Sequence, residues 1–344
     1  MLLLRGPSFK DRFPSQHRWP LSVCIQAYRL EPFALNIMTS FIVKDYSHQK
    51  LADGLYFGES PRYHDGLLYV SDMTGRKIYT IDPKSGEKKV LLEVENQPNG
   101  MCFAEDGSLI YSSMFDAKLH RLKDGKSSLY ADMSGIMTGY CGDMVIDNEG
   151  RVFLDDTGAR VLHGEAPRAG RVLRIDPDGS IRSVEENIIF PNALMISNDG
   201  KTLYNAESFG YGLLKFDLGT DGTLKDRRNV WSPATLAGER GASAASMIGI
   251  DGGCMDAEGG IWLCLLALEQ VARLDPETGI ITHRVKVDGH ATACTLGGED
   301  GKTLFICTNW TPKDEGLFTA MAGLRTRCTV SMARVDIGRG TALP

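Results

Sequence analysis

Short apolar runs alternate with polar turns along most of this 344-residue chain. From about residue 55 one unit recurs: a polar position, an apolar run, an acidic-glycine turn, a second apolar run, then a polar turn and more strands. The second apolar run has a similar sequence in all six units and predicts an equivalent strand in each: GLLYVSDM, SLIYSSM, RVFLDD, KTLYNAE, GIWLCL and KTLFICT. Helical periodicity is absent beyond short stretches, so the pattern predicts an all-β fold.

The turns within these units are acidic-glycine pairs, which suit tight hairpins because glycine adopts positive φ angles. They are Asp65-Gly66, Asp106-Gly107, Glu149-Gly150, Asp199-Gly200, Glu258-Gly259 and Asp300-Gly301. Successive glycines lie 41, 43, 50, 59 and 42 residues apart, close to the length of a propeller blade. We therefore predict a six-bladed β-propeller with four-stranded antiparallel blades over residues 39–344. Polar insertions around 160–171 and 235–246 explain the two longer intervals.

The first 38 residues differ from the rest, since they are basic, contain three prolines and show no sustained period. We expect residues 1–38 to lie outside the fold as a leader or disordered extension. Organelle targeting, disorder and sequence upstream of a start at Met38 are all open. In a closed propeller, residues 39–55 supply a strand to the last blade beside residues 329–337.

Composition narrows the possible partners. The net charge is −6 and no basic stripe interleaves with aromatic residues, so nucleic acid and anionic membrane are not expected partners. No apolar run is long enough for a membrane-spanning helix. We expect a cytoplasmic protein that acts on a small molecule, and its oligomeric state is open. A sequon at Asn309 is interpreted as chance. The cysteines show no C-x-x-C pair and are expected to be buried free thiols: Cys24, Cys102, Cys141, Cys254, Cys264, Cys294, Cys307 and Cys328.

Seven or eight residues before each turn glycine lies the start of an innermost strand, where side chains crowd the central channel. These positions hold Glu59, Asn99, Gly142 with Asp143, Asn192, Asp251 and Ala293. Five of the six blades thus direct an oxygen-bearing side chain at one axis. Clustered carboxylates repel one another unless a cation lies between them. Their hard oxygens favour Ca²⁺, Mg²⁺ or Mn²⁺ over zinc or copper.

Six segments occur in order along the chain: GESPRYHDGLLYVSDM, QPNGMCFAEDGSLIYSSM, GDMVIDNEGRVFLDD, FPNALMISNDGKTLYNAESF, IDGGCMDAEGGIWLC and ACTLGGEDGKTLFICT. Together they resemble the SMP-30/gluconolactonase/luciferin-regenerating family over roughly residues 55–337. The resemblance implies one divalent cation held by Glu59, Asn192 and Asp251, which the spacing also selects. Ca²⁺ is the first expectation, with Mg²⁺, Mn²⁺ or Zn²⁺ as alternatives.

The resemblance also implies roles for single residues. Asp251 would be the general base or nucleophile, while Arg62 and Asp143 would contact substrate or handle protons. Asn99 completes the polar ring as a substrate-binding residue or a support for the metal through water. The chain departs from the family where Gly142 replaces the usual Asn. Two further departures, Ala193 for Gly and Ile250 for Pro, keep the neighbouring oxygen ligand.

Each candidate also has a purely structural interpretation. Glu59 can be a solvated residue before a strand, Asn192 a turn-capping amide and Asp251 part of an Asp-Gly turn. Asp143 can bind loop amides, and Arg62 can form a surface ion pair.

We predict a metal-dependent hydrolase that opens a small lactone or related ester. Two alternative functions would use the same site: phosphotriester hydrolysis and a recruited role in secondary metabolism. In a competing mechanism, Asp251 attacks the substrate directly and forms an acyl or phosphoryl intermediate. A non-catalytic binding propeller and a metal-free, strictosidine-synthase-like propeller are alternatives of other classes.

Overall fold

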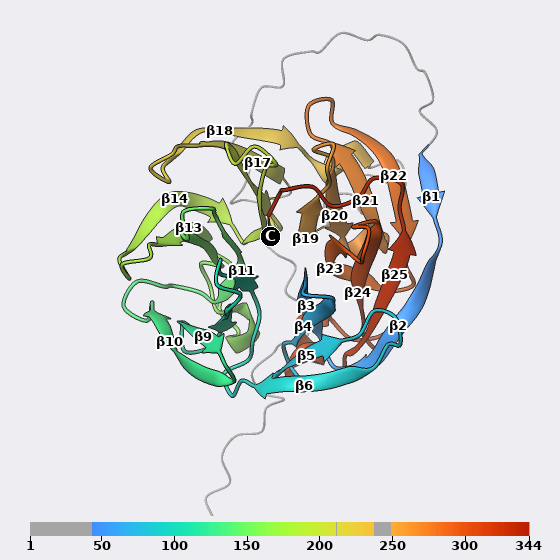
Figure 1. Cartoon of the computed structure of the whole chain (residues 1–344), viewed down its shortest axis with the longest axis horizontal. Helices are drawn as coiled ribbons and strands as arrows, with labels where there is room; N and C mark the ends of the chain where they lie inside the picture. Colours follow the sequence, from blue (N-terminus) through green and yellow to red (C-terminus); the bar gives the residue numbers. More distant parts are fainter. Residues whose placement is uncertain (1–42, 211, 237–248, 344) are drawn as a thin grey trace, which may run out of the picture. The chain divides into compact units, whose positions relative to one another are not determined.

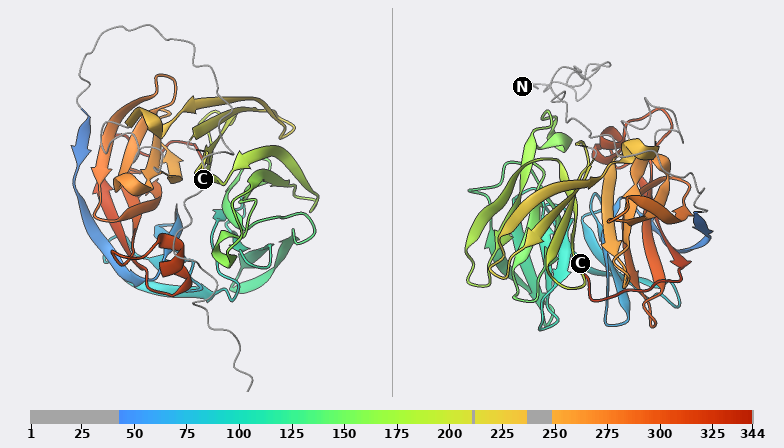
Figure 2. Two further views of the ribbon diagram at one scale, coloured as in Figure 1. Left: turned by 180° about the vertical axis from the view of Figure 1, so that it is seen from behind. Right: turned by 90° about the horizontal axis from the view of Figure 1, so that it is seen from above.

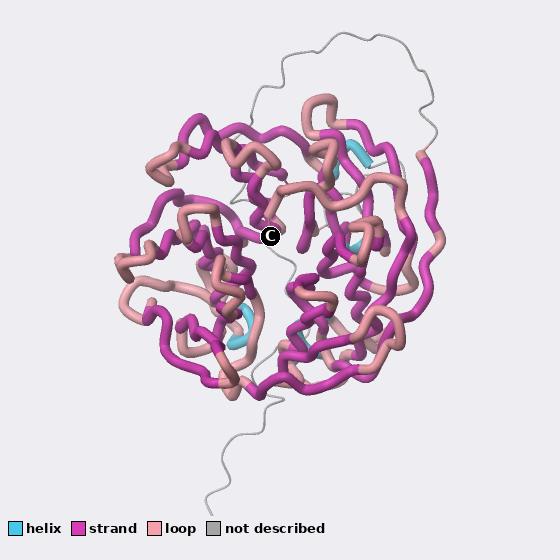
Figure 3. Tube along the Cα trace, in the orientation of Figure 1, coloured by secondary structure: helices cyan, strands magenta, loops and turns pink. Residues whose placement is uncertain are grey.

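Six antiparallel sheets surround a central axis in the computed structural model, which describes residues 43–210, 212–236 and 249–343 (Figure 1). Strands dominate and the few helices are short (Figure 3). The predicted six-bladed β-propeller is confirmed. The predicted leader, residues 1–38, lies outside the described residues.

Blades one to three follow the chain from the inner strand outward. The first contains β3 (Gly58–His64), β4 (Leu67–Asp72), β5 (Lys77–Ile81) and β6 (Lys88–Glu93). The second contains β7 (Met101–Phe103), β8 (Leu109–Ser113), β9 (Lys118–Lys123) and β10 (Lys126–Asp132). The third contains β11 (Cys141–Ile146), β12 (Val152–Asp156), β13 (Ala169–Ile175) and β14 (Ile181–Ile189). The predicted insertion near residue 160 lies between β12 and β13 and contains the short helix η2 (Val161–His163).

Blades four to six repeat the same order. The fourth contains β15 (Pro191–Ile196), β16 (Thr202–Glu207), β17 (Gly212–Leu218) and β18 (Leu224–Trp231), followed by η3 (Pro233–Leu236). The fifth contains β19 (Ile250–Met255), β20 (Ile261–Leu265), β21 (Gln270–Asp275) and β22 (Ile280–Lys286), with η4 (Leu266–Leu268) after β20. The sixth contains β23 (His290–Gly297), β24 (Thr303–Trp310) and β25 (Arg327–Arg334), with α3 (Leu317–Ala322) before β25. Most of the second predicted insertion, residues 237–248, lies outside the described residues.

The ring closes where the two ends of the propeller sequence meet. Strand β2 (His48–Leu55) pairs antiparallel with β25 and completes the last blade, as predicted. Buried Asn309 joins that blade to the first, because its amide donates to the Gly58 carbonyl and accepts from the Gly58 N–H, both at 3.0 Å. One strand was not predicted: β1 (Lys44–Tyr46) pairs in parallel with β22 as a fifth strand of blade five.

Apolar side chains between neighbouring blades form the core. Phe153 and Phe216 are fully buried in the cluster between blades three and four, and Trp262 is fully buried between blades five and six. The seven described cysteines are buried free thiols, which confirms that prediction for all but Cys24, a residue outside the described range. No helix among the described residues has the length and hydropathy of a bilayer-spanning segment.

The two ends of the channel are covered differently. At one end lie the six hairpin turns, whose glycines all have positive φ angles as predicted. The C-terminal segment crosses this end, where Leu343 pairs with Ile196 and Arg339 with Asp256 (Figure 1). The short helices gather at the opposite end, where α3 contacts η2 (Figure 2). The innermost strands begin at that helical end, so their first residues face the pocket there.

Candidate functional site

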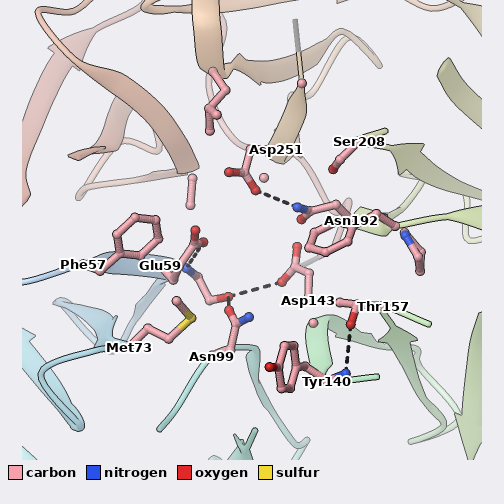
Figure 4. Close-up of a pocket in the computed structure, with 18 of the residues that line it drawn as sticks. Phe57, Glu59, Met73, Asn99, Tyr140, Asp143, Thr157, Asn192, Ser208 and Asp251 are labelled. Atoms are coloured by element: carbon pink, nitrogen blue, oxygen red, sulfur yellow. Dashed lines mark hydrogen bonds between the residues drawn. The ribbon is translucent and has the colours of Figure 1, made fainter. Parts of the chain in front are cut away.

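The polar residues selected by spacing line one pocket at the helical end of the channel. Figure 4 shows side chains from five blades converging on one space. Gly142 and Ala293 line this pocket. So do all the predicted site residues: Glu59, Arg62, Asn99, Asp143, Asn192 and Asp251. Residues almost 200 positions apart in the sequence therefore line the same pocket.

β-Bulges in the inner strands place these side chains. The strand register shifts between Glu59 and Arg62, between Asn192 and Met195, and in the corresponding part of β11 and β19. A bulge adds a residue to one strand and re-aims its side chains. Two bulges contain non-glycine residues with positive φ, at Ser60 (43°) and Ala193 (50°). The glycine usual in the family at position 193 would adopt that φ angle with less strain.

Asn192 and Asp251 contact each other directly. The Asn192 amide donates from Nδ2 to Oδ1 of Asp251 at 2.6 Å, while its Oδ1 accepts from the Ala193 N–H at 2.8 Å. Both residues lie within inner strands, so the interpretation of Asp251 as part of an Asp-Gly hairpin turn is wrong. The bond to Ala193 gives Asn192 a local structural role as well, yet its side chain still faces the pocket (Figure 4).

The carboxyl groups at the pocket floor are buried and repel one another when they are ionised. Burial raises the pKa of Asp251 to about 7. The hydrogen bond from Asn192 opposes this increase, and the nearby Asp143 carboxylate adds a smaller increase. Burial likewise raises the pKa of Glu59 well above its ordinary value, with further increases from Asp251 and Asp143. Glu59 is partly exposed to the pocket, so it is not the solvated surface residue of the alternative interpretation.

Arg62 holds Asp143 in place. The two side chains form a buried ion pair of 2.8 Å, and Arg62 Nη2 also donates to the Met144 carbonyl at 3.1 Å. Arg62 is only 4% exposed, so the alternative of a surface ion pair is wrong. Oδ1 of Asp143 accepts further hydrogen bonds from Ser60 Oγ and from the Met144 N–H. This network leaves Arg62 better placed to position Asp143 than to bind a ligand by itself.

Gly142, the main departure from the family pattern, is required by packing. A Cβ atom at this position would lie 2.9 Å from Cβ of Asp155. Asp155 is fully buried and accepts a 3.0 Å hydrogen bond from Asn205. Burial, and then the Asp143 carboxylate, raise the pKa of Asp155 well above its ordinary value. The space beside position 142 is therefore already filled by Cβ and the backbone oxygen of Asp155 and by the Thr157 methyl group.

A supporting ring of polar residues was missed by the sequence analysis. Four of the six second strands carry a polar residue at the fifth position after the turn glycine: Ser71, Ser112, Asp155 and Asn205. Ser71 Oγ donates to the Asn99 carbonyl at 2.7 Å, and Asn205 Nδ2 donates to the Asn192 carbonyl at 2.9 Å. Their common spacing from the glycine was the available signal, because strand alternation places these residues behind the pocket-lining strands.

The donor set fits a hard divalent cation. Among the described residues, no three His, Cys, Asp or Glu side chains stand close enough together to hold a metal by themselves. Glu59 and Asp251 supply two carboxylates, and the third protein ligand would be the Asn192 oxygen. As the amide stands, its nitrogen faces Asp251, so coordination requires the amide to rotate about χ2. Two carboxylates, an amide oxygen and solvent suit Ca²⁺ or Mg²⁺.

Comparison with known proteins decides the family. The model of the SMP-30/gluconolactonase/LRE-like region matches residues 57–309. The chain belongs to this family. Regucalcin from Gallus gallus is 27% identical over 265 residues, which cover 74% of this chain and 84% of that protein. The pentonolactonase XacC from Haloferax volcanii is 25% identical over 263 residues, covering 73% and 81%.

A solved structure supports the fold of this family member. The calcium-binding protein regucalcin from Agrobacterium tumefaciens superposes with a TM-score of 0.67 at 18% identity. The match covers 87% of this chain and 99% of that one. Both structures therefore share one propeller fold despite low sequence identity.

We expect the chelator-treated protein to lose stability as the pH rises. Asp251 has a folded-state pKa of about 7 against an ordinary value of 3.8, so the folded state binds its proton more tightly. That stabilisation is complete below about pH 4 and is lost as the pH rises through 7. Thermal unfolding in EDTA should show a melting temperature on the order of 5 °C lower at pH 8 than at pH 5. Added Ca²⁺ should raise it more at pH 8.

Asp251→Asn is the control for this titration, since it removes one carboxyl group and should reduce the pH dependence to the part that comes from Glu59 and Asp155. A melting temperature in EDTA that stays constant or rises between pH 5 and pH 8 would contradict the electrostatic account.

Restoring the usual family residue with Gly142→Asn should destabilise the protein by about 1–3 kcal/mol, because the new Cβ meets Asp155. Adding Asp155→Gly removes the opposing Cβ and should recover part of this loss, whereas Asp155→Ala retains that atom and should not. Urea unfolding of the single and double variants measures the coupling. Additive effects in both double variants would show that Asp155 is not the obstacle.

Proposed function

We propose that this protein is a metal-dependent hydrolase that opens a small lactone or related ester in the central channel. The observation that carries the proposal is the convergence of Glu59, Asn192 and Asp251 at the floor of one pocket. Membership of a family whose relatives include a pentonolactonase supports the reaction class. The calcium-binding description of the Agrobacterium regucalcin supports Ca²⁺ as the first candidate ion.

A bound divalent cation would supply a Lewis acid for the substrate carbonyl oxygen. Glu59, Asn192 and Asp251 would hold it. Asp251 also takes a proton from the attacking water, for which a carboxylate beside the reacting carbon is suited. Direct attack by Asp251 on the carbonyl is the competing route, and it depends on the same residue.

Asp143 is the second proton-handling group in this proposal. Three hydrogen bonds, from Arg62, Ser60 and the Met144 N–H, all fall on its Oδ1. Oδ2 is then the oxygen that faces the leaving group. The Arg62 guanidinium fixes the carboxylate so that this oxygen keeps one direction, and Asn99 supplies an amide on the same wall of the pocket.

The alternatives differ in what they require of the pocket. Phosphotriester hydrolysis would use the same ion and Asp251, so only the choice of substrate distinguishes it from lactone hydrolysis. Carboxylates that repel one another destabilise a pocket that binds no cation. Their presence at the floor therefore disfavours a binding propeller and a metal-free condensing enzyme.

The test is turnover of a lactone panel, followed by acid release, with Ca²⁺, Mg²⁺ and Mn²⁺ compared. Asp251→Asn should lower kcat/KM at least 100-fold, because general-base catalysis typically contributes ~100-fold or more. Asp288→Asn is a matched control, since Asp288 is exposed and outside the pocket lining. Full activity in EDTA, or equal rates for Asp251→Asn and the unaltered protein, would rule the mechanism out.

A further inference from the structure

Above the polar floor, the pocket wall is apolar. Five buried residues from the loops and helices at this end form one hydrophobic cluster: Phe57, Met73, Met114, Tyr140 and Met321. All five also line the pocket, which is open to solvent at its mouth. The side chains that would otherwise form a sealed core therefore present part of their surface to a ligand.

Three phenylalanines line the pocket beside this cluster. The ring centroids of Phe190 and Phe209 are 4.7 Å apart, and those of Phe209 and Phe318 are 6.5 Å apart. All three rings keep partial exposure, and Phe318 on α3 is 38% exposed. Aromatic rings in partial contact with solvent at a pocket mouth offer apolar area that a bound molecule can cover.

Phe190 is held in a strained backbone conformation. Its φ angle is 57°, in a region that a bulky residue before proline rarely adopts. Such strain persists only where the surrounding structure enforces it, and it gathers at functional sites. Here it places an aromatic ring two residues before Asn192, directly beside the polar floor.

The polar side chains of the wall are already hydrogen-bonded within the protein. Ser208 Oγ donates to the Ile250 carbonyl at 2.6 Å, and Thr157 Oγ1 donates to the Ala159 carbonyl at 3.2 Å. The Tyr140 hydroxyl pairs with Nδ1 of His163 at 2.5 Å. The hydroxyl protons of Ser208 and Thr157 are therefore already used, so a polyhydroxylated ligand finds fewer hydrogen-bond donors along this wall than in water.

We infer that the substrate carries an apolar alkyl or aromatic group on its lactone ring, rather than the hydroxyl groups of a sugar lactone. This inference rests on the proposed hydrolase function. Water adds to the carbonyl carbon, the ring C–O bond breaks, and the product is an apolar hydroxy acid. The carbonyl faces the polar floor while the apolar group lies against Phe190, Phe209 and Phe318.

The test compares γ-butyrolactone with γ-nonanolactone, which adds a five-carbon chain, and with glucono-δ-lactone and xylonolactone. We expect kcat/KM to rise on the order of 200-fold from butyrolactone to nonanolactone, because each of the five added carbons contributes about threefold when it is buried. Both sugar lactones should be poorer substrates than nonanolactone. Sugar lactones that exceed nonanolactone in an EDTA-sensitive reaction would overturn this inference and leave the proposed function standing.

Variants of the phenylalanine wall separate substrate recognition from folding. Phe318→Gln and Phe209→Gln should each reduce the nonanolactone-to-butyrolactone ratio of kcat/KM about 5- to 10-fold. Leu324→Gln is the matched control, because Leu324 follows the same helix and is 48% exposed but does not line the pocket. An unchanged ratio in both phenylalanine variants would contradict the assignment of the wall.

If no lactone is turned over, the proposed function fails and the apolar site is tested by binding alone. Calorimetric titration of the Ca²⁺-loaded protein with nonanolactone should then show binding that butyrolactone lacks and that Phe318→Gln weakens. Absence of such binding would overturn the inference as well.

Discussion

Carboxyl groups brought together away from water cannot all ionise without a compensating positive charge, and this constraint governs the hub of the propeller. Burial, and to a smaller extent neighbouring carboxylates, raise the pKa values of both Glu59 and Asp251. The buried guanidinium of Arg62 is committed to Asp143, so it does not serve the other two. Protons satisfy the pair at low pH, and a divalent cation would satisfy it at neutral pH. In the proposed function, metal binding and proton transfer would thus depend on the same residues.

The fold holds these opposed groups by surrounding them with structure from many blades. Ladder hydrogen bonds fix the inner strands, and a ring of second-strand residues such as Ser71 and Asn205 fixes the carbonyls beside the site. Three of the described non-glycine residues with positive φ angles lie at the pocket, namely Ser60, Phe190 and Ala193. The energy of a large β-fold therefore supports a few residues that would not adopt these positions in a smaller one. Polar chemistry lies at the floor, while loops and short helices supply an apolar wall.

Much of this arrangement could be predicted because turn spacing fixes strand register. Each turn glycine determines where the inner strand begins, so Glu59, Asn192 and Asp251 could be assigned to one channel. Other features depend on tertiary packing that no local pattern encodes. The contact between Gly142 and Asp155 joins two strands of one blade, and strand β1 is a three-residue polar segment without alternation. The apolar wall comes from loops and short helices, which have no period.

An anomalous difference map from crystals grown with Mn²⁺ tests the central claim most directly. The account predicts a strong peak at the hub, within about 2.0–2.6 Å of side-chain oxygens of Glu59, Asn192 and Asp251. The Asn192 amide should be turned so that its oxygen faces the ion. A map with no peak between these three side chains, at a pH where the carboxyl groups are ionised, would contradict it.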